Sequence, residues 1–223
     1  MPLVVKKLHI VMNLILTALF YLTALWLVCS ILQAMLLMLI RVPVSKIQLF
    51  YVSTPLRIRF HSCEVILGWI PVGSYVEYDT ANFFSKRFPV RLVCHFSSLI
   101  IFICIACICL SPSQGWVHFI AGFHQIAKGS LAPIDNATKY LAQWYRIANI
   151  SAIDGIGILA AKMAAFSLLP LGGGVITQIF ADLGATSGNE RIQFFALYNA
   201  VLTIMIMSLW IFAALWKMFT EYL

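Results

Sequence analysis

The sequence predicts a mainly α-helical polytopic membrane protein, with about four transmembrane helices and a small membrane-associated β-sheet between the first two. The first observation is composition, because 62% of the 223 residues are hydrophobic and only 10% are charged. The second is the presence of apolar runs that reach the length of about 20 residues needed to cross a bilayer. A soluble domain of this size does not contain so many apolar residues, and water would not cover their surface favourably, so lipid must cover it. We therefore treat residues 1–223 as a single membrane domain.

Basic residues concentrate in one segment between two predicted spans. The formal net charge is +7, and seven of the fifteen basic residues fall within residues 41–91. Such an excess is typical of a cytoplasmic loop rather than of a nucleic-acid-binding surface, so we expect no nucleic-acid partner. This orientation places both termini outside the cytoplasm of an integral protein of a bacterial-type inner membrane. Lys6 and Lys7 favour the opposite orientation, but the loop carries the larger charge.

The first apolar run covers residues 8–40 and is predicted to be a retained transmembrane helix. It is about twice the length of a signal-peptide core and lacks a small-residue cleavage site. It is also much longer than the roughly 20 residues that cross a bilayer. We therefore expect this helix to tilt, to project beyond the membrane, or to break.

The spacing of apolar residues changes within the loop of residues 41–91. Polar and apolar residues alternate along residues 46–52, 56–60 and 63–67, which predicts three short β-strands. Turn-forming residues at 53–55 and at 71–74 separate these segments. We expect a small antiparallel sheet or a pair of hairpins. Because irregular backbone is costly in lipid, the sheet should pack on the helices at the cytoplasmic face.

The second predicted span covers residues 92–110, between Arg91 and the Ser111–Pro112 pair. Residues 111–149 are more polar and contain few basic residues, so we place them outside the cytoplasm. Within this segment, residues 116–128 and 137–148 are expected to form amphipathic helices.

Two further apolar runs complete the expected membrane domain. The third span covers residues 150–180, and the last covers residues 194–216. Within the third span, Pro170 and the glycines at 172–174 should end or bend the helix.

The six cysteines predict neither a disulfide framework nor a redox function. Most of them lie within or beside apolar runs, where a thiol acts as a small apolar side chain. Cys104, Cys107 and Cys109 have a metal-like spacing, but they lie within a predicted span without an accompanying His or Asp. Since a thiolate in lipid is unfavourable, we expect no metal there.

Residues 70–77, Ile-Pro-Val-Gly-Ser-Tyr-Val-Glu, resemble the Pro-Leu-Gly-Gly-Tyr-Val-Lys loop of the site-two protease family of intramembrane zinc metalloproteases. Four more segments follow the family's pattern in the family's order, and the resemblance covers roughly residues 8–216. The insert that many members carry between the second and third spans is absent. The other matching segments are residues 42–50, 84–91, 128–133 and 168–174.

The resemblance implies a zinc site whose ligands this chain lacks. A hydrolytic zinc site needs three protein ligands, an open water position and a carboxylate base. The family's His-Glu-x-x-His falls on residues 29–33, where Cys29, Ser30 and Gln33 replace both histidines and the base. The third ligand, an Asp, falls near Gly172. We therefore expect no catalytic residue, no metal and no cofactor, and a chain that is not an enzyme.

The family's fold holds membrane segments. A member of that family without the zinc ligands is expected to bind such segments and not to cleave them. We expect a structural or regulatory subunit of a hetero-oligomeric membrane complex, which binds transmembrane or extended segments of other integral membrane proteins and contacts lipid. The expected partner-binding residues are Pro71, Val72, Gly73, Tyr75, Val76, Lys162, Gly172, Gly173 and Gly174.

Two other functions stay open. Cys29 paired with His95 would give an intramembrane hydrolase with a rearranged active site. A small transporter subunit is the third option, because Asp154 and Lys162 are ionisable residues in or near a predicted span.

Overall fold

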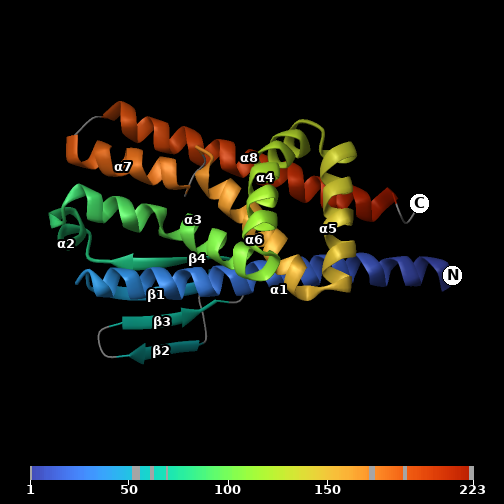
Figure 1. The fold of residues 1–223 in the computed structure, drawn as a ribbon, viewed down its shortest axis with the longest axis horizontal. Coiled ribbons are helices and arrows are strands. Elements are labelled where there is room, and N and C mark those ends of the chain that lie inside the picture. Colours follow the sequence, from blue (N-terminus) through green and yellow to red (C-terminus); the bar gives the residue numbers. More distant parts are fainter. Residues whose placement is uncertain are drawn as a thin grey trace. The chain divides into compact units, whose positions relative to one another are not determined.

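A computed structural model describes residues 2–51, 56–60, 63–68, 70–170, 174–187 and 190–220. As predicted, the chain is mainly helical, with a small four-stranded sheet between helices α1 and α2 (Figure 1). It divides into two compact units. One unit comprises Leu19–Ile101, and the other comprises Met1–Ala18 with Phe102–Leu223.

Helix α1 (Pro2–Leu39) is continuous, so the predicted possibility of a break is wrong. Its segment Leu16–Leu39 is long and apolar enough to cross a membrane. The helix ends in a reversal at Arg41, a non-glycine residue with a left-handed φ of 60°. There the Val42 N–H donates to the Leu37 carbonyl at 2.9 Å, which is the bond of a Schellman-type helix end. This reversal sends the chain directly into the first strand.

The sheet contains strands β1 (Val44–Tyr51), β2 (Leu56–Phe60), β3 (Cys63–Leu67) and β4 (Ile70–Tyr78). Three of them match the predicted strands. The predicted turn at residues 71–74 is wrong, because these residues belong to β4. A proline is tolerated in β4 because this strand lies at one edge of the sheet order β2-β3-β1-β4. The predicted turn at 53–55 lies outside the described residues.

The sheet is mixed, so the prediction of a purely antiparallel sheet is wrong. Strands β1 and β3 are parallel, with Ile47 opposite Val65, whereas the pairs β2–β3 and β1–β4 are antiparallel. The physical reason is that the β2–β3 hairpin places its second strand beside β1. Alternation in a sequence predicts that a segment is a strand, but it does not predict the strand's direction.

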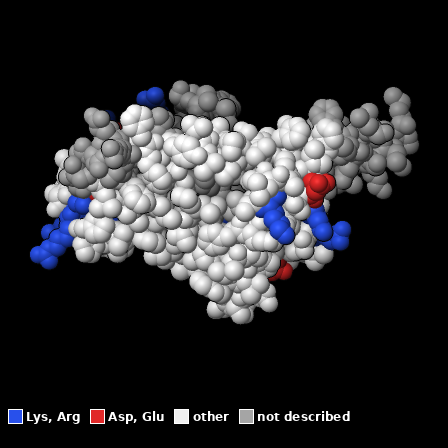
Figure 2. All heavy atoms as spheres, turned by 90° about the horizontal axis from the view of Figure 1, so that it is seen from above, with Lys and Arg blue, Asp and Glu red and all other residues white. Residues whose placement is uncertain are grey.

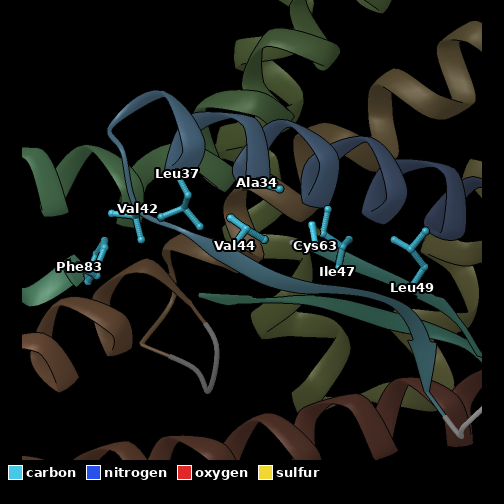
Figure 3. Packing of buried hydrophobic residues seen from close by; sticks show 8 residues of the cluster. All are labelled: Ala34, Leu37, Val42, Val44, Ile47, Leu49, Cys63 and Phe83. Carbon is cyan, nitrogen blue, oxygen red and sulfur yellow. The ribbon is translucent and has the colours of Figure 1, made fainter. Parts of the chain in front are cut away.

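One apolar face of this sheet packs on α1 and forms the core of the unit Leu19–Ile101. A bulge between Val44 and Lys46 shifts the register by one residue, which is why Val44 and Ile47 both face this core. In Figure 3 the labelled side chains from α1, the strands and α2 point toward one another. The buried members are Ala34, Leu37, Val42, Val44, Ile47, Leu49, Cys63 and Phe83.

Helix α2 (Thr80–Ser85) begins at the N-cap Asp79, whose carboxylate accepts from the Asn82 N–H at 3.0 Å. Helix α3 (Phe88–Leu110) is the second helix long and apolar enough to cross a membrane. It starts before the predicted residue 92, so Arg91 lies within the helix. The buried Arg91 guanidinium donates to the carbonyls of Phe84 and Lys86, which holds α2 against the start of α3.

The other unit is built from the remaining helices. The predicted amphipathic segments are helical, in α4 (Pro112–Leu131) and α5 (Thr138–Ile150), with a short π-helical turn η1 (Pro133–Ala137) between them. The predicted interruption near Pro170 is confirmed, because the third run forms α6 (Ala152–Leu168) and α7 (Val175–Ser187). The last helix is α8 (Glu190–Thr220), which lies beside α7 (Figure 1). The count of four spans stays a prediction, since two helices of the described residues are both long and apolar enough for crossing.

Small residues bring α4, α5 and α6 close together. Four alanines of α6 are completely buried, and a Cβ added at Gly122 of α4 would lie 2.7 Å from the Ala165 Cβ. Since real Cβ atoms do not approach so closely, glycine is required at this crossing. On another side of α6, the buried indole of Trp144 in α5 donates to the Gly155 carbonyl at 2.9 Å. The alanines are Ala160, Ala161, Ala164 and Ala165.

Candidate functional site

The segment predicted to correspond to the family's zinc-binding helix lies on the C-terminal half of α1. Cys29 and Gln33 are four residues apart, so they share one face of the helix. Cys29 and Ser30 are buried, and Gln33 is half-buried. These positions therefore face the interior of the unit Leu19–Ile101.

Ser30 joins α1 to the edge strand β4. Its hydroxyl lies 2.5 Å from the Ser74 hydroxyl, and the Ser74 Oγ also lies 3.3 Å from the Trp26 carbonyl oxygen. Because a carbonyl only accepts, the Ser74 proton goes to Trp26 and Ser30 donates to Ser74. Two consecutive hydrogen bonds thus fasten β4 to one turn of α1.

Gln33 joins α1 to α3. Its Nε2 donates to the Ser97 hydroxyl at 3.3 Å, and Ser97 in turn donates to the Cys94 carbonyl at 2.6 Å. Both bonds use side chains that are partly or fully shielded from solvent. Ser30 and Gln33 therefore connect α1 to β4 and to α3, respectively.

Removing the hydroxyl pair gives a direct measure of this connection. We expect Ser30→Ala and Ser74→Ala each to lower the free energy of unfolding by about 1 kcal/mol, with a coupling of about 0.5–1.5 kcal/mol in the double variant. Chemical denaturation of the four proteins in detergent measures the coupling. Ser45→Ala is the matched control, because the exposed Ser45 hydroxyl donates to the Glu77 carbonyl in the same sheet. Strictly additive effects at Ser30 and Ser74 would contradict the bond.

The proposed nucleophilic partner His95 is buried in the same unit. Its ring lies edge-on to the Phe83 ring, with centroids 5.7 Å apart. Phe83 in turn contacts Tyr78 and Phe84, so His95 borders an aromatic group that packs α2 on the sheet. The Cys29–His95 pair stays a prediction.

The expected partner-binding residues of the 70–77 loop all lie in β4. Tyr75 is exposed and accepts a hydrogen bond from the Lys46 ammonium at 3.0 Å, which raises the pKa of Lys46. Val76 is half-buried against the core cluster. Pro71, Val72 and Gly73 contribute backbone to this edge strand, and the side chains of Pro71 and Val72 lie outside the described ones.

The remaining expected residues belong to the other unit. Lys162 is half-buried on α6 and donates to the His118 carbonyl of α4 at 2.8 Å, so it helps to join these two helices. Asp154 lies in the first turn of α6, where a carboxylate interacts favourably with the helix N-terminus. Gly174 is buried at the bend before α7, and its carbonyl accepts from the Gln178 N–H. Gly172 and Gly173 lie outside the described residues.

Within the described ranges, His, Cys, Asp and Glu side chains do not gather in a group of three or more that could hold a metal ion. The six cysteines are free thiols, and Cys104 of the Cys104–Cys109 segment is exposed. Ser74 and Ser97 are the site residues that sequence reasoning missed. Ser74 stands within the matched loop, but a serine carries no signal that names its partner.

Comparisons with protein-family models, with curated proteins and with solved structures gave no match. The resemblance to the site-two proteases therefore stays a prediction from the order and spacing of the motifs in the sequence.

Proposed function

We propose that this chain is a catalytically inactive member of the site-two protease family, which acts as a structural or regulatory subunit of a larger membrane complex. The observation that carries the proposal is the set of hydrogen bonds that Ser30 and Gln33 form on α1. Ser30 and Gln33 form hydrogen bonds to β4 and α3 at positions where the family holds its base and a zinc ligand. Side chains engaged in this way support a scaffold rather than an open metal site.

Membrane insertion is part of the proposal. It is supported by the two helices long and apolar enough to cross a bilayer. On the face seen in Figure 2, uncharged side chains form most of the described surface, and charged ones are few. We place the chain in a bacterial-type inner membrane, with about four spans, the basic loop in the cytoplasm and both termini outside.

The binding surface in this proposal is the edge strand β4, and the bend at Gly174 is a separate proposed contact in the other unit. An edge strand has backbone N–H and C=O groups that can pair with an extended segment of a partner. Strand β4 pairs with β1 on one side only and carries the exposed Tyr75. Its attachment to α1 through Ser74 holds this edge in a fixed position, which favours binding because less motion is lost.

Site-specific photocrosslinking tests the subunit role. With a benzophenone amino acid at Tyr75, we expect one membrane protein to crosslink reproducibly in intact membranes, and mass spectrometry identifies it. The matched control is the same probe at Arg59, on the opposite edge strand β2. Equal crosslinking at both edges, or a monodisperse protein free of partners in mild detergent, would contradict a partner-binding role for β4.

Metal analysis separates this function from that of a hydrolase with a rearranged site. We expect much less than one zinc per chain after purification, because Cys29, Ser30 and Gln33 do not supply a ligand set of the family's kind. Elemental analysis of the purified chain gives this ratio. Stoichiometric zinc, or a hydrolytic activity lost on Cys29→Ala or His95→Ala, would decide for the hydrolase.

A further inference from the structure

Charged residues of alternating sign form one row across the sheet, on the face opposite the core cluster. Residues opposite one another on neighbouring strands point to the same side of a sheet, so each member of the row lies beside the next. Opposite charges in such positions attract each other, and the sign changes at every strand of this row. From β2 to β4 the row contains Arg59, Glu64, Lys46 and Glu77.

This row ends on an acidic residue at the open edge of β4. Glu77 is exposed, and β4 pairs with β1 on its other side only. Within the described ranges, Glu64 pairs with Arg57 at 3.7 Å, whereas Glu77 forms no ion pair. The Lys46 ammonium, between the two carboxylates of the row, donates to the Tyr75 hydroxyl at 3.0 Å. The Glu77 carboxylate is therefore available to a residue on an added strand.

The other face of the sheet sets a second requirement for such a strand. There the adjacent row ends at Val76, which is half-buried and packs against the core cluster. Its neighbour across the pair is Ile47 of β1, which is buried. A strand added beside β4 would place one side chain next to Val76 and the following one next to Glu77. An apolar residue suits the first position, and a basic residue continues the alternation of charge at the second.

The path of β4 along α1 indicates which part of a membrane protein can supply this strand. The Ser74 Oγ lies 3.3 Å from the Trp26 carbonyl oxygen, in the segment of α1 that is proposed to cross the membrane. After β4, the Asp79 N–H donates to the Pro43 carbonyl at 3.0 Å, beyond the end of α1. Glu77 therefore lies toward the cytoplasmic end of α1 in the proposed orientation. Lys and Arg are abundant in the cytoplasmic flanks of transmembrane helices.

We propose that β4 selects a basic segment, the extended cytoplasmic flank of a partner's transmembrane helix, with Lys or Arg opposite Glu77 and an apolar residue opposite Val76. The inference rests on the proposed binding by the β4 edge and adds the charge that selects the partner. The net charge of this chain is +7, so its long-range field favours acidic ligands over basic ones. A preference for a basic strand would therefore report the local effect of Glu77.

Labelled peptides test this preference on the full chain in a neutral detergent. One short peptide alternates lysine with valine, and a matched peptide alternates glutamate with valine. We expect fluorescence anisotropy to show tighter binding of the lysine peptide, and Glu77→Gln to weaken this binding about 2–5-fold, the effect of one cross-strand charge pair.

The matched control is Glu64→Gln, which changes the net charge equally but removes an acid of the same row away from the edge. It should leave the affinity for the lysine peptide nearly unchanged. Equal losses at Glu77 and Glu64, or tighter binding of the glutamate peptide by the unchanged chain, would overturn the inference.

Charge reversal separates this inference from the proposed function. We expect Glu77→Lys to bind the glutamate peptide more tightly than the lysine peptide, and to reduce crosslinking of the membrane partner by the benzophenone probe at Tyr75. Partner crosslinking that stays unchanged in Glu77→Lys would overturn the charge preference and leave the binding role of β4 intact. Absence of a crosslinked partner at Tyr75 with Glu77 in place would overturn the binding role, and the inference with it.

Discussion

Phe83→Ala is expected to lower the free energy of unfolding by about 3–5 kcal/mol, the usual cost of emptying a buried phenylalanine site. Phe83 is 2% exposed and belongs to the core cluster between α1 and the sheet. Its ring also contacts Tyr78 and His95, so its loss leaves a cavity where α2, β4 and α3 meet. Thermal denaturation in detergent, followed by circular dichroism, measures the loss.

The adjacent Phe84 provides the matched control. It lies on the same short helix but is 39% exposed. Its carbonyl, which accepts from Arg91, is backbone and survives substitution. We expect Phe84→Ala to cost about 1 kcal/mol or less, as surface substitutions usually do. Equal losses at both positions would show that the cluster around Phe83 does not form the core described.

Gly122→Ala is expected to destabilise the α4–α6 contact, although alanine favours a helix over glycine. The added Cβ would lie 2.7 Å from the Ala165 Cβ and 3.3 Å from the Lys162 Cδ, so the helices must separate. Overpacking lowers the free energy of unfolding by about 1–3 kcal/mol. The greater helix preference of alanine raises it by about 1 kcal/mol, so the net loss is up to about 2 kcal/mol. The separation also lengthens the bond from Lys162 to the His118 carbonyl.

A compensating variant makes this second prediction specific. Ala165→Gly removes the methyl group that the new Cβ meets, so the double variant Gly122→Ala with Ala165→Gly should regain part of the lost stability. Ala127→Leu, on an exposed part of α4, should change stability by less than about 0.5 kcal/mol. Chemical denaturation of these four variants and the wild type gives the comparison. A double variant less stable than either single one would contradict the close crossing.

Much of the fold was predictable because its signals are local. Alternation along residues 56–60 and 63–67 predicts both strands at their observed bounds, and the apolar run before Arg41 predicts α1. Pro170 and its neighbouring glycines predict the interruption between α6 and α7. Each of these features depends on the intrinsic preferences of residues close together in the sequence.

The predictions that were wrong concern features that depend on contacts between residues far apart in the sequence. Pro71 and Gly73 are typical of a turn, but pairing with β1 extends this segment as an edge strand. The parallel pairing of β1 and β3 depends on which strand of a hairpin arrives beside β1, and no local residue specifies that. The same holds for the candidate site, where the motif predicts the segment Cys29–Gln33 but the partners Ser74 and Ser97 depend on packing.

The bonds of Ser30 and Gln33 have a consequence for how such a chain can evolve. A working zinc site needs three ligands and a base at once, so no single substitution restores activity. Each substitution toward His or Glu at these positions, however, breaks a bond that joins α1 to β4 or α3. A first step back at Ser30 or Gln33 therefore lowers stability without any catalytic gain. Under the proposed descent, the hydrogen bonds of these two side chains oppose a return of proteolysis.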